Sequence, residues 1–183
     1  MGAEYDILID ARRIQQAVSE LGGELSELYS GEEVVVIPLL RGAFVFAADL
    51  IRAMNLPVRV EFIGAASYGA ETVSSGEVRL TLDTSFPLHD KHVLIVEDIV
   101  DTGLTLAYIQ KLIASRNPRS IRTVVLLDKP SRRRVRADLY KTLFTIPDRF
   151  VVGYGLDGPG GFWRNLPVIA ALRDGTENTK IER

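Results

Sequence analysis

Apolar and polar positions follow two rhythms along this chain, and each rhythm predicts a different kind of element. Residues 10–29 place apolar side chains three and four positions apart, which predicts an amphipathic helix with Asp10 as its N-cap. Residues 34–40, VVVIPLL, are apolar throughout and predict a buried strand. The same patterns predict helices over 43–55 and 104–116, and strands over 58–67, 77–83, 93–96, 120–128, 149–157 and 167–172.

The order of these elements indicates the fold class. Strands alternate with helices and several strands are apolar along their whole length, which is typical of an α/β fold with a mostly parallel sheet flanked by helices. The 183 residues contain no internal repeat and no low-complexity linker, so we expect a single domain over 1–183. In such folds ligands bind beyond the carboxyl ends of the strands.

The composition of the chain argues against several classes of function. The net charge of −2 gives no overall basic field for nucleic acid, and no apolar run is long enough to span a membrane. The absence of cysteine excludes disulfides, thiolate metal sites and a cysteine nucleophile, and it suits a reducing cytoplasm. The basic run SRRRVR at 131–136 is interpreted as a solvated turn or as a positive rim that attracts a phosphorylated substrate, rather than as an RNA site.

Charged residues follow four of the predicted strands. Arg41 and Gly42 come after the first apolar run, and Lys129 and Asp157 come after two later ones. The densest group is in residues 92–106, HVLIVEDIVDTGLTL, where three carboxylates and a small-residue turn follow an apolar strand. Because parallel strands end at the same edge of a sheet, these side chains should lie close together.

The stretch 92–106 suits a sugar phosphate. A turn that leads into a helix offers backbone N–H groups and the positive end of the helix dipole to a phosphate, and Thr102 and Thr105 add hydroxyl donors. Glu97 and Asp98 would repel a phosphate, but they suit vicinal hydroxyls or a Mg²⁺ ion. The simpler alternative is that these acids only cap the next helix, which needs one acid rather than three.

These residues also carry a resemblance to a known family. VLIVEDIVDTGLTL resembles the phosphoribosyl-diphosphate (PRPP) motif of the type I phosphoribosyltransferases, and its Glu-Asp start resembles the 6-oxopurine branch, the hypoxanthine-guanine phosphoribosyltransferases. The stretches LLRGAFVFAADLIR, VVLLDK, IPDRFVVGYGLD and FWRNLPVI agree with the family in order and approximate spacing, so the similarity runs from about residue 34 to 172.

The resemblance implies a fold and an activity. The fold would be the family's parallel sheet, with a small hood formed by the N- and C-terminal segments and a flexible flap that begins at Ser67 and Tyr68. The activity would be purine salvage in the cytoplasm: transfer of 5-phosphoribosyl from PRPP to hypoxanthine or guanine, giving IMP or GMP and pyrophosphate, with Mg²⁺ as cofactor. The partners would be PRPP, a 6-oxopurine and further copies of the chain in a homodimer or homotetramer, with no nucleic acid and no membrane.

The resemblance also implies residue roles. Asp101 would be the general base near purine N7, and Glu97, Asp98 and Asp157 would be the metal-binding acids. The set that binds PRPP and its phosphates would be Arg41, Gly42, Glu97, Asp98, Ile99, Val100, Asp101, Thr102, Gly103, Leu104, Thr105 and Arg164. The purine-binding set would be Lys129, Arg149, Phe150, Val151 and Asp157. A non-proline cis peptide is expected at Leu40-Arg41.

Some positions depart from the family pattern. Arg41 stands where lysine is common, Leu104 stands where some members have lysine, and Gly158-Pro159-Gly160-Gly161 replaces polar and aromatic residues. Two other functions stay open: a phosphoribosyltransferase for another base such as xanthine, and a non-catalytic regulator on the same fold that binds RNA and senses nucleotides. The GxGxxG match at 153–158 lacks a following helix pattern, which argues against dinucleotide binding.

Overall fold

Two β-sheets of different size organise the chain, in a computed structural model that describes residues 5–67 and 78–173. The larger sheet has the strand order β5-β4-β2-β6-β7-β8, with β3 also paired to β2, and the smaller has the order β1-β10-β9. The large-sheet strands are β2 (Val34–Leu40), β3 (Val58–Val60), β4 (Ile63–Ser67), β5 (Val78–Leu82), β6 (His92–Val100), β7 (Ser120–Asp128) and β8 (Lys141–Thr145). The small-sheet strands are β1 (Tyr5–Ile9), β9 (Val151–Val152) and β10 (Ile169–Leu172).

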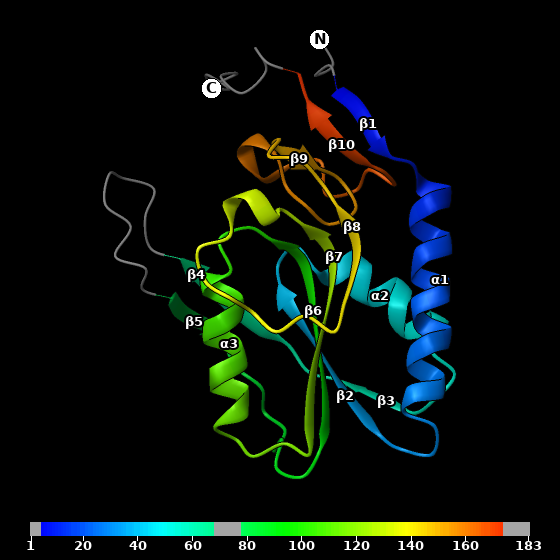
Figure 1. Cartoon of the computed structure of the whole chain (residues 1–183), viewed down its shortest axis with the longest axis vertical. Helices are drawn as coiled ribbons and strands as arrows, with labels where there is room; N and C mark the ends of the chain where they lie inside the picture. The colour runs from blue at the N-terminus through cyan, green and yellow to red at the C-terminus, as the bar shows by residue number, and fades with distance from the viewer. Residues whose placement is uncertain (1–4, 68–77, 174–183) are drawn as a thin grey trace.

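Within the described residues, three α-helices cover the large sheet: α1 (Ala11–Leu28), α2 (Phe44–Ala53) and α3 (Leu104–Ala114). Figure 1 shows α3 on one side of the sheet and α1 and α2 on the other. The strands are buried on both faces because alternate residues point in opposite directions: Val34 and Val36 pack with α1 and α2, whereas Val35 and Ile37 pack with α3. A strand in this position must be apolar throughout, which explains the VVVIPLL run.

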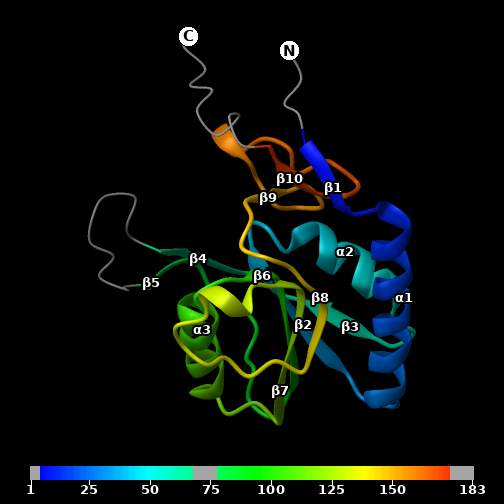
Figure 2. The same cartoon turned by 45° about the horizontal axis from the view of Figure 1, so that its top comes forward.

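The central strands are parallel, so their carboxyl ends meet at one edge. β2 pairs with β3, β4 and β6, β6 pairs with β7, and β7 pairs with β8, all in parallel; only β5 is antiparallel, to β4. The small sheet, made from the first and last described strands with β9, stands at one end of the large sheet (Figure 2). This arrangement agrees with the expected hood of N- and C-terminal segments. Within the described ranges no helix is long and apolar enough to cross a membrane.

The main helix and strand predictions are confirmed. Helix α1 runs unbroken through Gly22-Gly23, and its cap Asp10 accepts a hydrogen bond from the Arg13 N–H at 3.0 Å. The predicted strand over 58–67 is wrong in one detail, because it divides into β3 and β4 around Glu61-Phe62. Of the strand predicted over 149–157, only β9 is regular. β1 and β8 were not predicted.

Candidate active site

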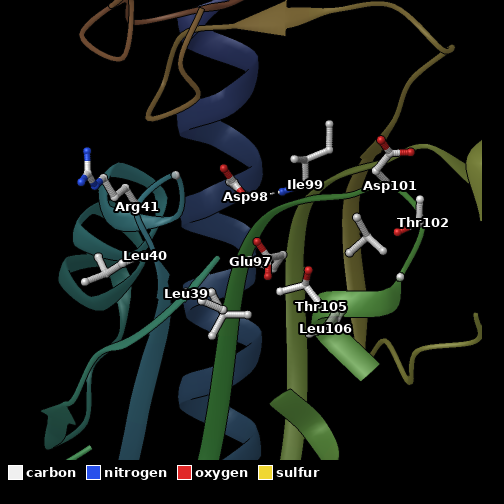
Figure 3. A pocket seen from close by; sticks show the side chains of 14 residues that line it. Leu39, Leu40, Arg41, Glu97, Asp98, Ile99, Asp101, Thr102, Thr105 and Leu106 are labelled. Carbon is white, nitrogen blue, oxygen red and sulfur yellow. Dashed lines mark hydrogen bonds between the residues drawn. The ribbon is translucent and has the colours of Figure 1, made fainter. Parts of the chain in front are cut away.

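The acidic pair lies inside a strand rather than after it. The pattern predicted a strand over 93–96, but β6 continues to Val100, with Glu97 opposite Val125 and Val100 opposite Asp128 on β7. The prediction stopped early because consecutive carboxylates are rare within a buried strand. Here both acidic residues line a cavity of about 230 Å³ beyond the sheet edge instead of packing in the apolar core. Figure 3 shows both acids between Arg41 and Asp101.

The two carboxylates make an electrostatically unfavourable pair. Burial raises the pKa of Glu97 well above its usual value, and the charge of Asp98 raises it further. Burial also raises the pKa of Asp98. Hydrogen bonds that Asp98 accepts from Glu97 and from the Ile99 N–H act in the opposite direction and lower this pKa; the Ile99 nitrogen lies 2.8 Å from Asp98 Oδ1. A ligand that supplies hydroxyl donors or a cation would relieve this repulsion.

The first loop approaches the acids very closely. The peptide bond Leu40-Arg41 is cis, as expected. A Cβ atom built on Gly42 would lie 1.5 Å from Asp98 Oδ2, so only glycine fits while this carboxylate keeps its present position. The Arg41 side chain is exposed at the edge of the cavity and points away from the acids in Figure 3. The loop therefore places backbone groups, rather than its arginine, next to Asp98.

The turn after β6 leads into α3 as the sequence predicted. Gly103 has φ +83° at the N-cap of α3, and a Cβ atom there would lie 2.4 Å from the Val135 carbonyl oxygen. The Leu104 N–H donates to Thr102 Oγ1 at 3.4 Å. Thr102, Gly103 and Thr105 line the same cavity as Glu97, whereas Leu104 does not. The cavity thus joins an acidic side to a helix N-terminus with hydroxyl donors.

Arg132 and Asp148 were not singled out from the sequence. Arg132 contacts Asp101, the predicted general base, and Asp148 lies near Lys129, which is predicted to bind the purine. Arg132 donates to Asp101 Oδ1 at 2.6 Å and to Asp148 Oδ2 at 3.3 Å. The buried Lys129 places its Nζ 3.8 Å from Asp148 Oδ1. Arg132 belongs to the SRRRVR run, which from the sequence alone is interpreted as a solvated turn or a positive rim. That basic run was the one feature of the sequence that could have indicated Arg132. Asp148 follows a proline and gave no distinctive pattern.

The C-terminal segment adds a second group of charged residues. Arg164 pairs with Asp157 Oδ2 at 2.9 Å and donates to the Gly155 carbonyl at 2.6 Å. The turn over 158–161 is closed by a hydrogen bond from the Gly161 N–H to the Gly158 carbonyl at 3.0 Å. This extra turn therefore leaves Arg164 in contact with Asp157.

The predicted base-side residues lie around β9. Phe150 is 48% exposed, as an aromatic platform for a ligand would be, and Val151 is buried in β9. Arg149 instead pairs with Asp6 Oδ2 at 3.3 Å, so its guanidinium faces β1. Ser67 ends β4, where its backbone pairs with Val78, and Tyr68 lies outside the described residues.

The acids do not form a closed metal cage. Across residues 5–67 and 78–173, no three His, Cys, Asp or Glu side chains gather as a metal-binding group. Mg²⁺ is commonly held by one or two carboxylates together with substrate phosphates. Glu97 and Asp98, adjacent carboxylates whose pKa values are raised at an open cavity, fit that requirement, whereas Asp157 is already paired with Arg164.

The GxGxxG match does not belong to a dinucleotide-binding fold. After β9 the chain forms a short bridge between Gly153 and Leu156, followed by the 3₁₀ turn Pro159–Gly161 rather than an α-helix. A dinucleotide site would need a helix N-terminus at that place to hold the pyrophosphate.

The fold and this cavity together define a phosphoribosyltransferase, and the chain belongs to that family: the phosphoribosyl transferase domain matches residues 4–158. Hypoxanthine phosphoribosyltransferase of Haemophilus influenzae is 44% identical over 155 residues, 83% of this chain and 87% of the relative. Hypoxanthine-guanine phosphoribosyltransferase of Bacillus subtilis is 44% identical over 169 residues, 91% of this chain and 92% of the relative.

A solved structure agrees with the sequence relatives. The hypoxanthine-guanine phosphoribosyltransferase of Bacillus anthracis has a TM-score of 0.87 and 42% identity, with coverage of 94% of this chain and 100% of that chain. The chain is thus a purine phosphoribosyltransferase, an enzyme that transfers a pentosyl group. The family resemblance read from residues 92–106 is confirmed.

Proposed function

We propose that the enzyme transfers 5-phosphoribosyl from PRPP to hypoxanthine or guanine and releases pyrophosphate. One observation carries the proposal: β6 sets Glu97 and Asp98 in the same cavity as the turn 101–105 and the loop at Arg41-Gly42. This cavity offers acceptors for ribose hydroxyls on one side and donors for a phosphate on the other. The named activities of the relatives, hypoxanthine and guanine phosphoribosyl transfer, support this choice of substrates.

Asp101 is the proposed general base. Its carboxylate lies on the cavity between the acids and the turn, and it accepts from Arg132 at 2.6 Å. Removal of a proton from the purine would make its nitrogen a better nucleophile at ribose C1. Arg132 would hold the carboxylate in place, and it would yield or share this contact when a purine nitrogen approaches. Arg132 itself is tied to Asp148 at 3.3 Å, which limits its movement.

Lys129 is the proposed reader of the purine O6. Its side chain is buried beyond β7, and its ammonium group is only loosely paired with Asp148. An oxygen at purine position 6 would accept from this ammonium group, whereas the amino group of adenine would leave a buried donor unpaired. Phe150 would stack on the base, and Val151 would offer a backbone carbonyl. The Lys129 ammonium group would also donate to the O6 of xanthine, so xanthine is one of the bases to be tested.

Mg²⁺ is the proposed cofactor. Glu97 and Asp98 would hold it or the ribose hydroxyls, and the ion would neutralise charge on the leaving pyrophosphate. Arg164 and the backbone of Gly42 would bind the pyrophosphate side of PRPP. Because Asp157 pairs with Arg164, its part in metal binding depends on release from that arginine when PRPP binds.

Assembly and location stay predictions. We propose a homodimer or homotetramer in the cytoplasm, without nucleic acid or membrane partners. A solved relative, the hypoxanthine phosphoribosyltransferase of Trypanosoma cruzi, is 43% identical with a TM-score of 0.85, and its C-terminal region is described as having a role in oligomeric state and activity. Sedimentation of the purified chain would measure the assembly directly.

The test is product formation from PRPP and Mg²⁺ with hypoxanthine, guanine, xanthine, adenine and uracil offered separately. The parent should form IMP and GMP and refuse adenine and uracil. Asp101→Asn should lower kcat by roughly 10²- to 10⁴-fold, the usual contribution of a general base. Asp138→Asn is the matched control, because the Asp138 side chain is 91% exposed and does not line the cavity.

Each alternative has its own outcome in this assay. Turnover of xanthine alone would replace the proposed substrates with that base. If no base is consumed while PRPP still binds, the transferase proposal fails. RNA retention that weakens steeply with salt would then favour the regulator on the same fold.

A further inference from the structure

Three consecutive residues after β9 have left-handed backbone conformations. Gly153, Tyr154 and Gly155 have φ values of 98°, 46° and 102°. Glycine adopts such values freely, but a tyrosine there is strained and must be held by its surroundings. Reciprocal hydrogen bonds between Gly153 and Leu156, each 3.0 Å, close the turn, and the Tyr154 N–H donates to the Leu166 carbonyl at 2.8 Å.

The side chain of Tyr154 ties this turn to α2. Its hydroxyl donates to Asp49 Oδ2 at 2.6 Å, and the residue is 7% exposed. The ring lines a cavity of about 440 Å³ between α1 and α2, with Ile14 and Val18 among its neighbours. Burial, together with the Asp49 carboxylate, raises the pKa of the phenol, so the hydroxyl remains a donor.

The opposite side of the turn touches the active site. A Cβ atom on Gly155 would lie 2.2 Å from the Gly42 carbonyl oxygen, and one on Gly42 would lie 1.5 Å from Asp98 Oδ2. Arg164 reaches the Gly155 carbonyl at 2.6 Å while it pairs with Asp157. The backbone of the turn therefore fits between the first loop and the Arg164–Asp157 pair with no room for a side chain.

We propose that Tyr154 is a positioning residue for PRPP: its hydrogen bond to Asp49 fixes the turn 153–155 against Gly42. The turn in turn sets the separation between the first loop and Arg164. The phenol touches no substrate and acts only through this backbone. The inference rests on the proposed function, because it assigns the pyrophosphate part of PRPP to the groups on either side of the turn.

The first test is Tyr154→Phe, which keeps the ring and removes the hydroxyl. The KM for PRPP should rise roughly three- to tenfold, which is less than the full contribution of a hydrogen bond to a charged group, because the phenol acts only through the backbone of the turn. The KM for hypoxanthine should change less than twofold. Tyr140→Phe is the matched control, because the Tyr140 hydroxyl also donates to a carboxylate, Glu24 Oε1 at 2.9 Å, and lines no part of the site.

A double-mutant cycle distinguishes a positioning role of Tyr154 from a general loss of stability. Asp49→Asn keeps an acceptor for the phenol and should leave the KM for PRPP close to that of the parent. Asp49→Ala should reproduce the effect of Tyr154→Phe, and the double variant should be no worse than either single variant, because all three lack the same bond. Additive effects would overturn the proposal.

Amide hydrogen exchange gives a readout that needs no activity. Peptides covering 40–45 and 150–158 should exchange faster in Tyr154→Phe and not in Tyr140→Phe. Unchanged exchange, or an equal rise in the KM of both substrates, would overturn the positioning role. If the parent forms no product from PRPP, the proposed function fails separately, and the exchange result still decides whether Tyr154 holds the turn.

Discussion

Gly42→Ala tests the close approach of the first loop to the acidic pair. The new Cβ atom would lie 1.5 Å from Asp98 Oδ2 and 2.5 Å from Asp98 Cγ, far inside any non-bonded contact. The atom that must yield is the end of a side chain, so the fold should survive while the carboxylate rotates away. Rotation gives up the hydrogen bond from the Ile99 N–H at 2.8 Å.

The magnitude follows from what Asp98 loses. An off-rotamer side chain costs about 0.5–1.5 kcal/mol, and a hydrogen bond to a charged group is worth about 1.5–3 kcal/mol. If PRPP requires Asp98 in its present position, the sum of about 2–4.5 kcal/mol lowers kcat/KM for PRPP by roughly 30- to 1,600-fold at 1.4 kcal/mol per tenfold. Initial rates of IMP formation at varied PRPP measure this directly.

Gly23→Ala is the control for the substitution itself. An added Cβ atom at Gly23 meets nothing within 4 Å, and the position lies inside α1. Alanine should stabilise the helix by about 0.5–1 kcal/mol and leave the rates unchanged. A Gly42→Ala enzyme whose kcat/KM stays within threefold of the parent would refute the reasoning, because Asp98 would then not need its present place.

Two further predictions concern base recognition and acid stability. Lys129→Met should lower kcat/KM for hypoxanthine by at least roughly tenfold and leave the KM for PRPP unchanged. An equal loss of kcat/KM for hypoxanthine and for PRPP in the same rate assay would contradict the assignment of Lys129 to the purine O6. The hydrogen bond from Arg116 lowers the pKa of Asp83, so this pair stabilises the fold above about pH 4 and the stabilisation is lost as the pH falls through the lowered pKa. The free energy of unfolding, measured in urea from pH 7 to pH 3, should therefore fall less steeply with acid for Asp83→Asn than for the parent. Parallel pH dependences of the two proteins would count against this role of the pair.

The sequence predicted the large sheet well because burial on both faces leaves a strong signal. The run 34–40 is apolar throughout and 120–128 contains the apolar run Val124–Leu127, and the structure confirms the two segments as β2 and β7. β1 and β8 escaped detection because each is short and mostly half-exposed, with polar residues that fit a loop equally well. Both strands lie at a sheet edge, and β1 pairs with a strand far away in sequence, so the local pattern carries little information.

The site was predicted in outline and not in its contacts. Residues 97–105 were found because a strand, three acids and a small-residue turn follow one another within one segment. Arg132, Asp148 and Tyr154 were not singled out because their roles depend on contacts between separate segments. A basic run, a proline-flanked acid and a tyrosine between glycines have many possible roles, and only the three-dimensional arrangement selects one.

The pairing of β1 with β10 has a consequence for how the enzyme is made. Tyr5 lies opposite Leu172, so β1 is synthesised long before the strand with which it pairs. The strands of the large sheet pair over shorter separations in sequence, whereas the small sheet must wait until β10 has been synthesised. Val151 belongs to β9 of this small sheet, and Phe150 directly precedes it. The proposed phosphate side of the site can thus form while the chain is still being synthesised, whereas the proposed base side is completed only after β10 has been made.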